Sequence, residues 1–269
     1  MTQRLFEVES VQASRRVRAS DYLAVEEPLA IRITHGPANA RQRETISITM
    51  RTPGQDADLA AGFLFAEGVI HSPDQILAIE PSQSESAVRV EIHPEVQIDF
   101  ARLDRRGLTT SSCGVCGKTS LEAIEAVCED PRAGGSVPAS MIHELPARLR
   151  TAQPAFSQTG GLHAAALFDL RGTLLAVRED VGRHNAVDKL IGAEFRAGRV
   201  PLHDRILLVS GRASFELIQK AAMAAVPVFA AIGAPSSLAV SLAERLGLTL
   251  LGFVRDGRFN IYSGAERIA

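Results

Sequence analysis

The sequence predicts an α/β protein in which a smaller α+β domain precedes a larger domain of alternating strands and helices. Two observations carry this prediction. Period-2 alternation of apolar residues dominates the first hundred residues, with one helical pattern among them. From about residue 160 onward, strand patterns and helix patterns alternate, which is typical of a parallel sheet with covered faces. We therefore expect the smaller domain over residues 1–108, a cysteine loop over 109–120 and the larger domain over 121–269.

The smaller domain begins with two predicted strands and a helix. Apolar residues alternate with polar ones over 29–33 and over 46–50, and Pro53 with Gly54 stops the second run. The segment 56–66 then carries apolar residues at helical spacing, which predicts an amphipathic helix.

A hairpin is predicted to follow this helix. Apolar residues alternate over 88–92 and again over 96–100, with His93 and Pro94 between the two runs. These elements together make the first hundred residues α+β.

The segment after Phe100 is charged and then rich in hydroxyl side chains, so it is predicted to be an exposed linker that carries the cysteine loop. A helix is expected after the loop, because Thr119 and Glu122 fit a capping box. An apolar stripe on this helix would include Leu121, Ile124 and Cys128.

The larger domain is predicted from continuous apolar strands separated by helix patterns. Its first two strands turn at Arg171 and Gly172. Predicted strands cover 163–170, 173–180, 205–210, 226–232 and 248–254, and predicted helices cover 183–196, 215–224 and 238–246.

Composition excludes several classes of protein. The chain has 269 residues, 46% hydrophobic and 22% charged, which favours a globular protein over a disordered one. A formal net charge of −2 argues against a general nucleic-acid binder. The first ten residues show no secretory signal, and the most apolar stretch is short and broken by Pro227. We expect a cytoplasmic protein with no membrane segment.

The loop TTSSCGVCGKTS contains Cys113 and Cys116, which are separated by two residues, with glycines at 114 and 117 and a predicted helix after the loop. A helix N-terminus and Lys118 both favour the thiolate form, which is the reactive form of cysteine. Three cysteines in a cytosolic chain argue against a disulfide framework. Metal binding, redox chemistry and nucleophilic chemistry remain.

Three interpretations of this pair stay open. A structural zinc site would need Cys128 and His143 as further ligands. A redox disulfide of the thioredoxin kind would be expected after a strand in a βαβ unit, which is missing here. A cysteine that carries a group covalently, assisted by its neighbour, explains exposure, acidity and mobility together, and we favour it.

Turns that are suited to anions are predicted where strands of the larger domain give way to helices. Free amide groups and the helix dipole favour phosphate at such places, and Arg255 and Arg258 add planar guanidinium groups. The segments are 179–189, 210–214, 233–237 and 253–262.

Four titratable residues near these turns have a structural and a functional interpretation. His184 and Asp188 are spaced i, i+4 and could form a local pair. His163 could be a hydrogen-bonded core residue, and either histidine could instead assist proton transfer. Asp180 is expected to cap the helix that begins near Arg183.

With these segments in place, the chain resembles the formate dehydrogenase accessory sulfurtransferase family, FdhD. The resemblance covers nearly the whole sequence and rests on SSCGVCGK, GGLHAAALFD, REDVGRHNAVDK, SGRASFE and FVRDGRFNIY, in that order. It implies a sulfurtransferase that takes sulfur from a cysteine desulfurase as a cysteine persulfide. The sulfur would pass to the molybdenum or tungsten cofactor with two pterin guanine dinucleotides, and formate dehydrogenase would become active.

The resemblance also assigns residues. It implies that Cys113 is the persulfide carrier and that Cys116 is its partner. It implies a homodimer, and a second domain shaped like that of cytidine deaminases. The zinc-binding motifs of a deaminase are missing from the corresponding turns, so no metal site is expected there. A cofactor chaperone without sulfur chemistry is the alternative. The implied contacts to the guanine dinucleotide are Phe253, Val254, Arg255, Asp256, Gly257 and Arg258.

Overall fold

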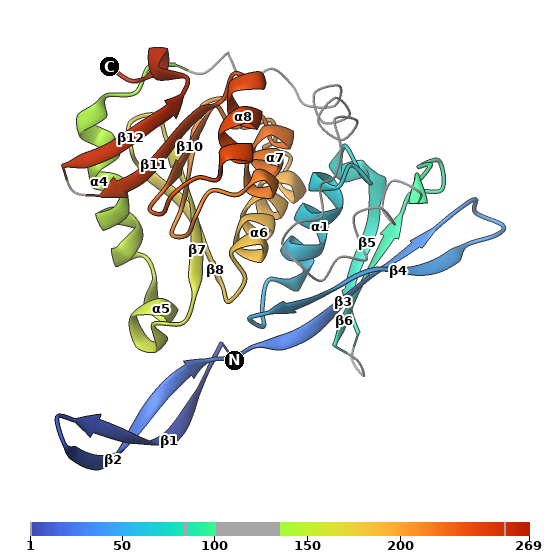
Figure 1. Ribbon diagram of the computed structural model, residues 1–269. Helices are drawn as coiled ribbons and strands as arrows, with labels where there is room; N and C mark the ends of the chain where they lie inside the picture. The colour runs from blue at the N-terminus through green and yellow to red at the C-terminus, as the bar shows by residue number, and fades with distance from the viewer. Residues whose placement is uncertain (1, 83–85, 101–134, 256) are drawn as a thin grey trace.

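The computed structural model describes residues 2–82, 86–100, 135–255 and 257–269 and is a mixed α/β fold with three sheets (Figure 1). Two strands form a separate ribbon, four form a small sheet in the order β4-β3-β6-β5, and six form a large sheet in the order β12-β11-β10-β9-β7-β8. None of the described helices is long and apolar enough to cross a membrane.

The small sheet confirms the first two predicted strands and the helix. β3 and β4 pair as antiparallel neighbours, and α1 packs on the face that carries the buried side chains Leu29, Ile31 and Ile33. The elements of this part are β1 (Gln3–Gln12), β2 (Arg15–Ala24), β3 (Glu27–His35), β4 (Gln42–Arg51), α1 (Asp56–Ala66), β5 (Ile76–Pro81) and β6 (Ala87–Ile92).

The predicted hairpin over 88–100 is wrong in its second strand. β6 pairs with β5, which precedes it, and with β3. Residues 96–99 have no regular structure, but Val96, Ile98 and Phe100 pack against the core, and the Phe100 ring lies 4.8 Å from the His35 ring. The alternation there reflects burial of one side of an irregular segment, because packing on a core does not require strand pairing.

The large sheet confirms the predicted alternation. Strands β8, β9, β10 and β11 point the same way, while β7 and β12 are antiparallel to their neighbours. The elements are β7 (His163–Asp169), β8 (Leu174–Asp180), α6 (Arg183–Arg196), β9 (Arg205–Val209), α7 (Phe215–Met223), β10 (Val228–Ala231), α8 (Ser237–Arg245), β11 (Thr249–Arg255) and β12 (Arg258–Ser263).

Helices cover both faces of the large sheet. α6, α7 and α8 lie on one face, where their apolar side chains form one core with those of α1 and the small sheet. The opposite face is covered by α4 (Ala139–Thr151), through Met141, Ile142, Leu145 and Leu149, and the short α5 (Pro154–Thr159) follows α4. Figure 1 shows α4 and α8 on opposite sides of the sheet.

A buried ion pair joins the small sheet to the large one. Lys189 of α6 lies 2.7 Å from Asp180 at the end of β8, and its ammonium group also donates to the Thr52 carbonyl at 2.8 Å. Asp180 in turn accepts from the Thr52 amide at 3.1 Å. Because both charged groups are almost fully buried, these bonds fix the position of the β8 end and the start of α6 relative to the small sheet.

Candidate functional site

One edge of the large sheet brings the predicted anion-binding turns together. The strands β8 to β11 all end at this edge, and β7 begins there. The Gly233 amide donates to the Gly211 carbonyl at 3.0 Å, and the Phe253 amide donates to the Gly233 carbonyl at 3.1 Å. The turns after β9, β10 and β11 are therefore bonded into one unit, as the strand-exit pattern predicted.

The close packing of these turns explains why two positions in this region, Gly233 and Gly252, are occupied by glycine. A Cβ atom on Gly233 would lie 2.9 Å from the Gly211 carbonyl oxygen. One on Gly252 would lie 2.8 Å from the Tyr262 ring and 2.9 Å from the Pro235 ring. Contacts this short do not occur for real Cβ atoms, so side chains are excluded at both positions and the backbone of the turns is tightly packed.

His184 is bonded to two side chains of the neighbouring turn. Its Nε2 atom lies 2.9 Å from the Glu216 carboxylate and 3.2 Å from the Ser214 hydroxyl. Ser214 is the N-cap residue of α7, yet its hydroxyl makes no cap hydrogen bond. The bond to His184 is the main cause that lowers the pKa of Glu216. The imidazole is thus held between an ionised carboxylate and a hydroxyl.

His163 and Arg183 lie beside this group. Both approach Gly211: a Cβ built there would lie 3.4 Å from the imidazole of His163 and 3.7 Å from Cδ of Arg183. Burial lowers the pKa of His163, and the positive charge of Arg183 lowers it further. The Nε atom of Arg183 is buried without a hydrogen-bond partner among the described residues. This edge therefore presents the guanidinium charge of Arg183, which favours an anionic group, beside an imidazole that is shifted toward its neutral form.

Two local predictions at this edge are wrong. Asp188 does not pair with His184; it is buried and lies 2.7 Å from Lys220 of α7. Asp180 does not cap α6, whose N-cap residue is Gly182, although it accepts from the Gly182 amide at 2.8 Å. In both cases a buried lysine, Lys220 of α7 for Asp188 and Lys189 of α6 for Asp180, provides a stronger partner than the one that was predicted.

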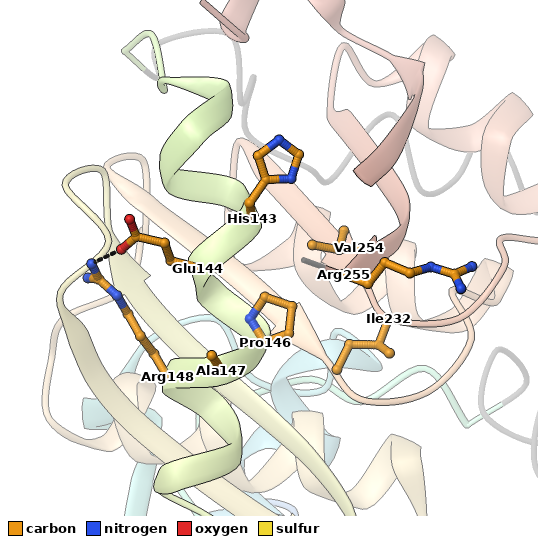
Figure 2. A pocket seen from close by; sticks show the side chains of 8 residues that line it. All are labelled: His143, Glu144, Pro146, Ala147, Arg148, Ile232, Val254 and Arg255. Carbon is orange, nitrogen blue, oxygen red and sulfur yellow. Dashed lines mark hydrogen bonds and ion pairs between the residues drawn. The ribbon is translucent and has the colours of Figure 1, made fainter. Parts of the chain in front are cut away.

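A pocket of about 650 Å³ opens between α4 and the end of β11. Figure 2 shows α4 along one wall, with His143 and Arg148, and the residues Val254 and Arg255 along the other. Arg148 is held in place by Glu144 and by the Gly172 carbonyl. The lining residues are His143, Glu144, Pro146, Ala147, Arg148, Ile232, Val254 and Arg255.

The residues that the resemblance assigned to the guanine dinucleotide lie in different surroundings in the structure, and only two of them line the pocket. Val254 is fully buried and Arg255 is exposed, and both line the pocket. Phe253 has a left-handed backbone with φ 54°, which turns the end of the strand toward Gly233. Arg258 is exposed, and its backbone lies opposite that of Arg255 in the antiparallel register of β11 and β12. Gly257 has φ 67° in the connecting turn, and Asp256 lies outside the described residues.

The α4 wall of the pocket was not predicted from the sequence. The signal was present in the spacing of Met141, Ile142, Leu145 and Leu149, but Pro146 lies inside the helix and obscures it. His143, which the zinc interpretation used, lies with its ring 5.0 Å from the Phe259 ring, and its Nδ1 atom is buried without a described partner.

The predicted cysteine loop and the helix after it lie outside the described residues. This holds for Cys113 and Cys116, which the resemblance assigned to catalysis, and for Cys128. Their chemistry stays a prediction.

Comparison with known proteins gives a consistent result. A sequence model of the FdhD/NarQ family matches residues 24–269. The chain is 47% identical to the sulfur carrier protein FdhD of Nocardia farcinica over 258 residues, covering 94% of this chain and 90% of that protein. It is 49% identical to the protein of the same name in Streptomyces coelicolor over 260 residues, covering 93% and 89%. A crystal structure from Desulfotalea psychrophila, assigned as a formate dehydrogenase accessory protein, has a TM-score of 0.77 at 26% identity and covers 100% of both chains.

Proposed function

Because the chain belongs to the FdhD/NarQ family, we propose that it is a sulfur carrier in the maturation of formate dehydrogenase. The relatives named as sulfur carriers align with more than nine tenths of the chain, so the proposal concerns the whole protein rather than one domain. We further propose that it is a sulfurtransferase with a cysteine persulfide on Cys113, and that it works in the cytoplasm.

The chemistry of loading follows from the cysteine pair. The Cys113 thiolate attacks the outer sulfur of a persulfide on a cysteine desulfurase. A new S–S bond forms on Cys113, the S–S bond of the donor breaks, and the donor leaves as a thiolate that takes up the proton released by Cys113. No electrons are gained or lost in this exchange. Cys116, separated from Cys113 by two residues, would assist the transfer or resolve the persulfide.

The acceptor in this proposal is the molybdenum or tungsten cofactor with its two pterin guanine dinucleotides, which is the substrate of the transfer. The observation that carries this part is the pocket between α4 and β11, because Val254 and Arg255 from the FVRDGRFNIY segment line it. Its volume of about 650 Å³ lies within the range of small-molecule sites. Arg255 and Arg258 at the hairpin supply positive charge for a diphosphate group.

The edge with His163, Arg183 and His184 supports the same substrate class. It lies on the end of the sheet at which β10 and β11 also finish, next to the turns that carry the pocket residue Ile232. We propose that Arg183 receives another anionic group of the bulky acceptor. We also propose that the large sheet is of the cytidine deaminase type, with Ser214 and His184 at turns where a deaminase would carry zinc ligands.

A chaperone that binds the cofactor without carrying sulfur is the alternative, and the basic turns alone would suffice for it. A strain that lacks its own family member separates the two. The wild-type gene restores formate dehydrogenase activity in both cases. Cys113→Ala restores none if sulfur transfer is required, whereas a chaperone would retain the activity. Arg150→Ala is the surface control, because Arg150 is exposed near the end of α4, contacts the Phe156 ring and is not among the residues that line the pocket.

A further inference from the structure

The guanidinium group of Arg183 has no anionic partner in the described part of the chain. Among those residues it takes part in no ion pair, and its Nε atom is buried without a hydrogen bond. Partial burial of a charge without a counter-ion costs free energy, because the lost contacts with water are not replaced. A bound anion would supply the missing partner.

Two helix starts meet beside this guanidinium group. α6 begins with Arg183 and His184, and α7 begins after Ser214. Neither N-cap residue makes a side-chain cap hydrogen bond, so both first turns keep amide groups and the positive end of a helix dipole for another partner. The contact of 2.9 Å between His184 and Glu216 joins the two starts. Helix N-termini in such surroundings bind phosphate groups.

His163 of β7 can gain positive charge next to these helix starts. Burial lowers the pKa of His163, and the positive charge of Arg183 and the nearby His184 lower it further. Asp180 acts in the opposite direction, but its carboxylate is already paired with Lys189. An anion beside Arg183 would offset the guanidinium charge, so His163 would bind a proton more readily in the presence of the anion.

Glu216 is the negative group already present at this edge. The hydrogen bond from His184 is the main cause that lowers the pKa of Glu216, and the charges of Lys220 and Arg183 act in the same direction. The carboxylate is therefore ionised at neutral pH and repels a second anion. An incoming anion must gain more from Arg183 and the helix amides than it loses to Glu216. This condition favours a doubly charged group with several oxygen atoms over a single carboxylate.

We propose that His163, Arg183, His184, Ser214 and Glu216 surround an anion site, the edge site, which binds a phosphate-type dianion together with a proton. Arg183 and the first-turn amides of α7 hold the oxygen atoms, His163 takes up the proton, and Glu216 limits the affinity. None of these five residues lines the pocket between α4 and β11, so the two sites are distinct. As a site for the acceptor of sulfur, the edge site rests on the proposed function; as a site for a free inorganic anion, it does not.

Calorimetric titration of the purified full-length protein with sulfate tests the edge site, because sulfate keeps both charges over the whole pH range in which histidine titrates. Arg183→Ala should weaken sulfate binding about tenfold or more. Glu216→Gln should tighten it, which a damaged fold would not do. His71→Gln is the control, because His71 is exposed between α1 and β5, outside the edge site. Equal binding by all of these proteins would be an adventitious ion only and would overturn the proposal.

The pH dependence of the same titration tests the bound proton. Sulfate should bind more tightly as the pH falls from about 7.5 to about 5.5, because His163 becomes charged when the anion is bound. Proton uptake should also make the measured heat depend on the ionisation enthalpy of the buffer. Both effects should be smaller in His163→Gln. An affinity that is independent of pH in the wild type, or that changes equally in His163→Gln, would overturn the proposal.

Two further measurements separate the edge site from the proposed function. Guanosine diphosphate that competes with sulfate would identify a nucleotide as the source of the phosphate group, and independent binding of the two would identify a free phosphate. Arg183→Ala should still gain one sulfur atom from a cysteine desulfurase, since loading takes place on Cys113. A wild type that gains no sulfur would contradict the proposed function and leave the edge site standing as a site for a free anion.

Discussion

Gly62 of α1 and Gly192 of α6 lie where the backbones of the two helices touch. A Cβ atom on Gly62 would overlap the Asp188 carbonyl of α6, and one on Gly192 would overlap the Asp58 carbonyl of α1. The two helices belong to different layers, since α1 covers the small sheet and α6 covers the large one. This crossing therefore sets the distance between the two sheets.

Substitution of either glycine by alanine is predicted to destabilise the fold. The added methyl group meets backbone atoms, which cannot move aside as a flexible side chain would, so we expect a loss of about 3 kcal/mol or more in the free energy of unfolding. Urea denaturation measures it. Gly161→Ala is the control, since the nearest atom to its Cβ would be 3.6 Å away, and it should change the stability by less than about 1 kcal/mol.

The buried pair of Asp188 and Lys220 is predicted to be costly to break. Burial raises the pKa of Asp188; for Lys220, burial works against the charge, but the neighbouring carboxylate of Asp188 raises its pKa overall. Lys220→Met leaves a buried carboxylate alone and should cost about 3–5 kcal/mol. The double variant Asp188→Asn, Lys220→Met should recover part of that loss, because no charge stays buried. A double variant that is less stable than Lys220→Met would contradict this account.

Stability is predicted to fall as the pH is lowered from neutral, in part because of His163. Its pKa in the folded protein lies below the ordinary value of 6.5, first because of burial and then because of Arg183. The unfolded chain therefore binds a proton more readily, and folding loses stability as the pH falls below about 6.5. His163→Gln should lose less stability than the wild type between about pH 7.5 and pH 5.5. Equal losses in the two proteins would show that His163 does not contribute.

The pocket is predicted to bind a guanine nucleotide through Arg255. Loss of a charge-assisted hydrogen bond should weaken the binding of guanosine diphosphate about tenfold or more in Arg255→Ala. Calorimetric titration measures this, and Arg150→Ala, on the same helix as the pocket wall but outside it, should bind like the wild type. Equal affinity in all three proteins would place the nucleotide elsewhere.

Four strands of the large sheet, β7, β9, β10 and β11, were predictable because they are buried on both sides and appear as continuous apolar runs. β12 was not predicted, and its side chains are at most partly buried. The helix over Arg183–Arg196 was predicted with both of its ends. The two-stranded ribbon of β1 and β2 was missed for the opposite reason: its apolar residues are interleaved with charges and belong to neither core cluster. β5 was missed as well, since Pro81 ends it and Leu77 is exposed.

The candidate site shows the same limit. Turns at strand ends were found from the sequence because they lie next to recognisable strands. The bond of His184 to Glu216 was not, since it joins the first turns of two helices that only the folded sheet brings together on its one face. Local spacing favoured Asp188 as the partner of His184. In the folded protein the Asp188 carboxylate instead pairs with Lys220.

The central claim is that this protein carries sulfur on Cys113. Incubation of the pure protein with a cysteine desulfurase and cysteine, followed by intact mass measurement without reductant, tests it most directly. The wild type should gain the mass of one sulfur atom, the gain should disappear on treatment with a thiol, and Cys113→Ala should gain nothing. No added mass in the wild type, or an addition that persists in Cys113→Ala, would contradict the claim.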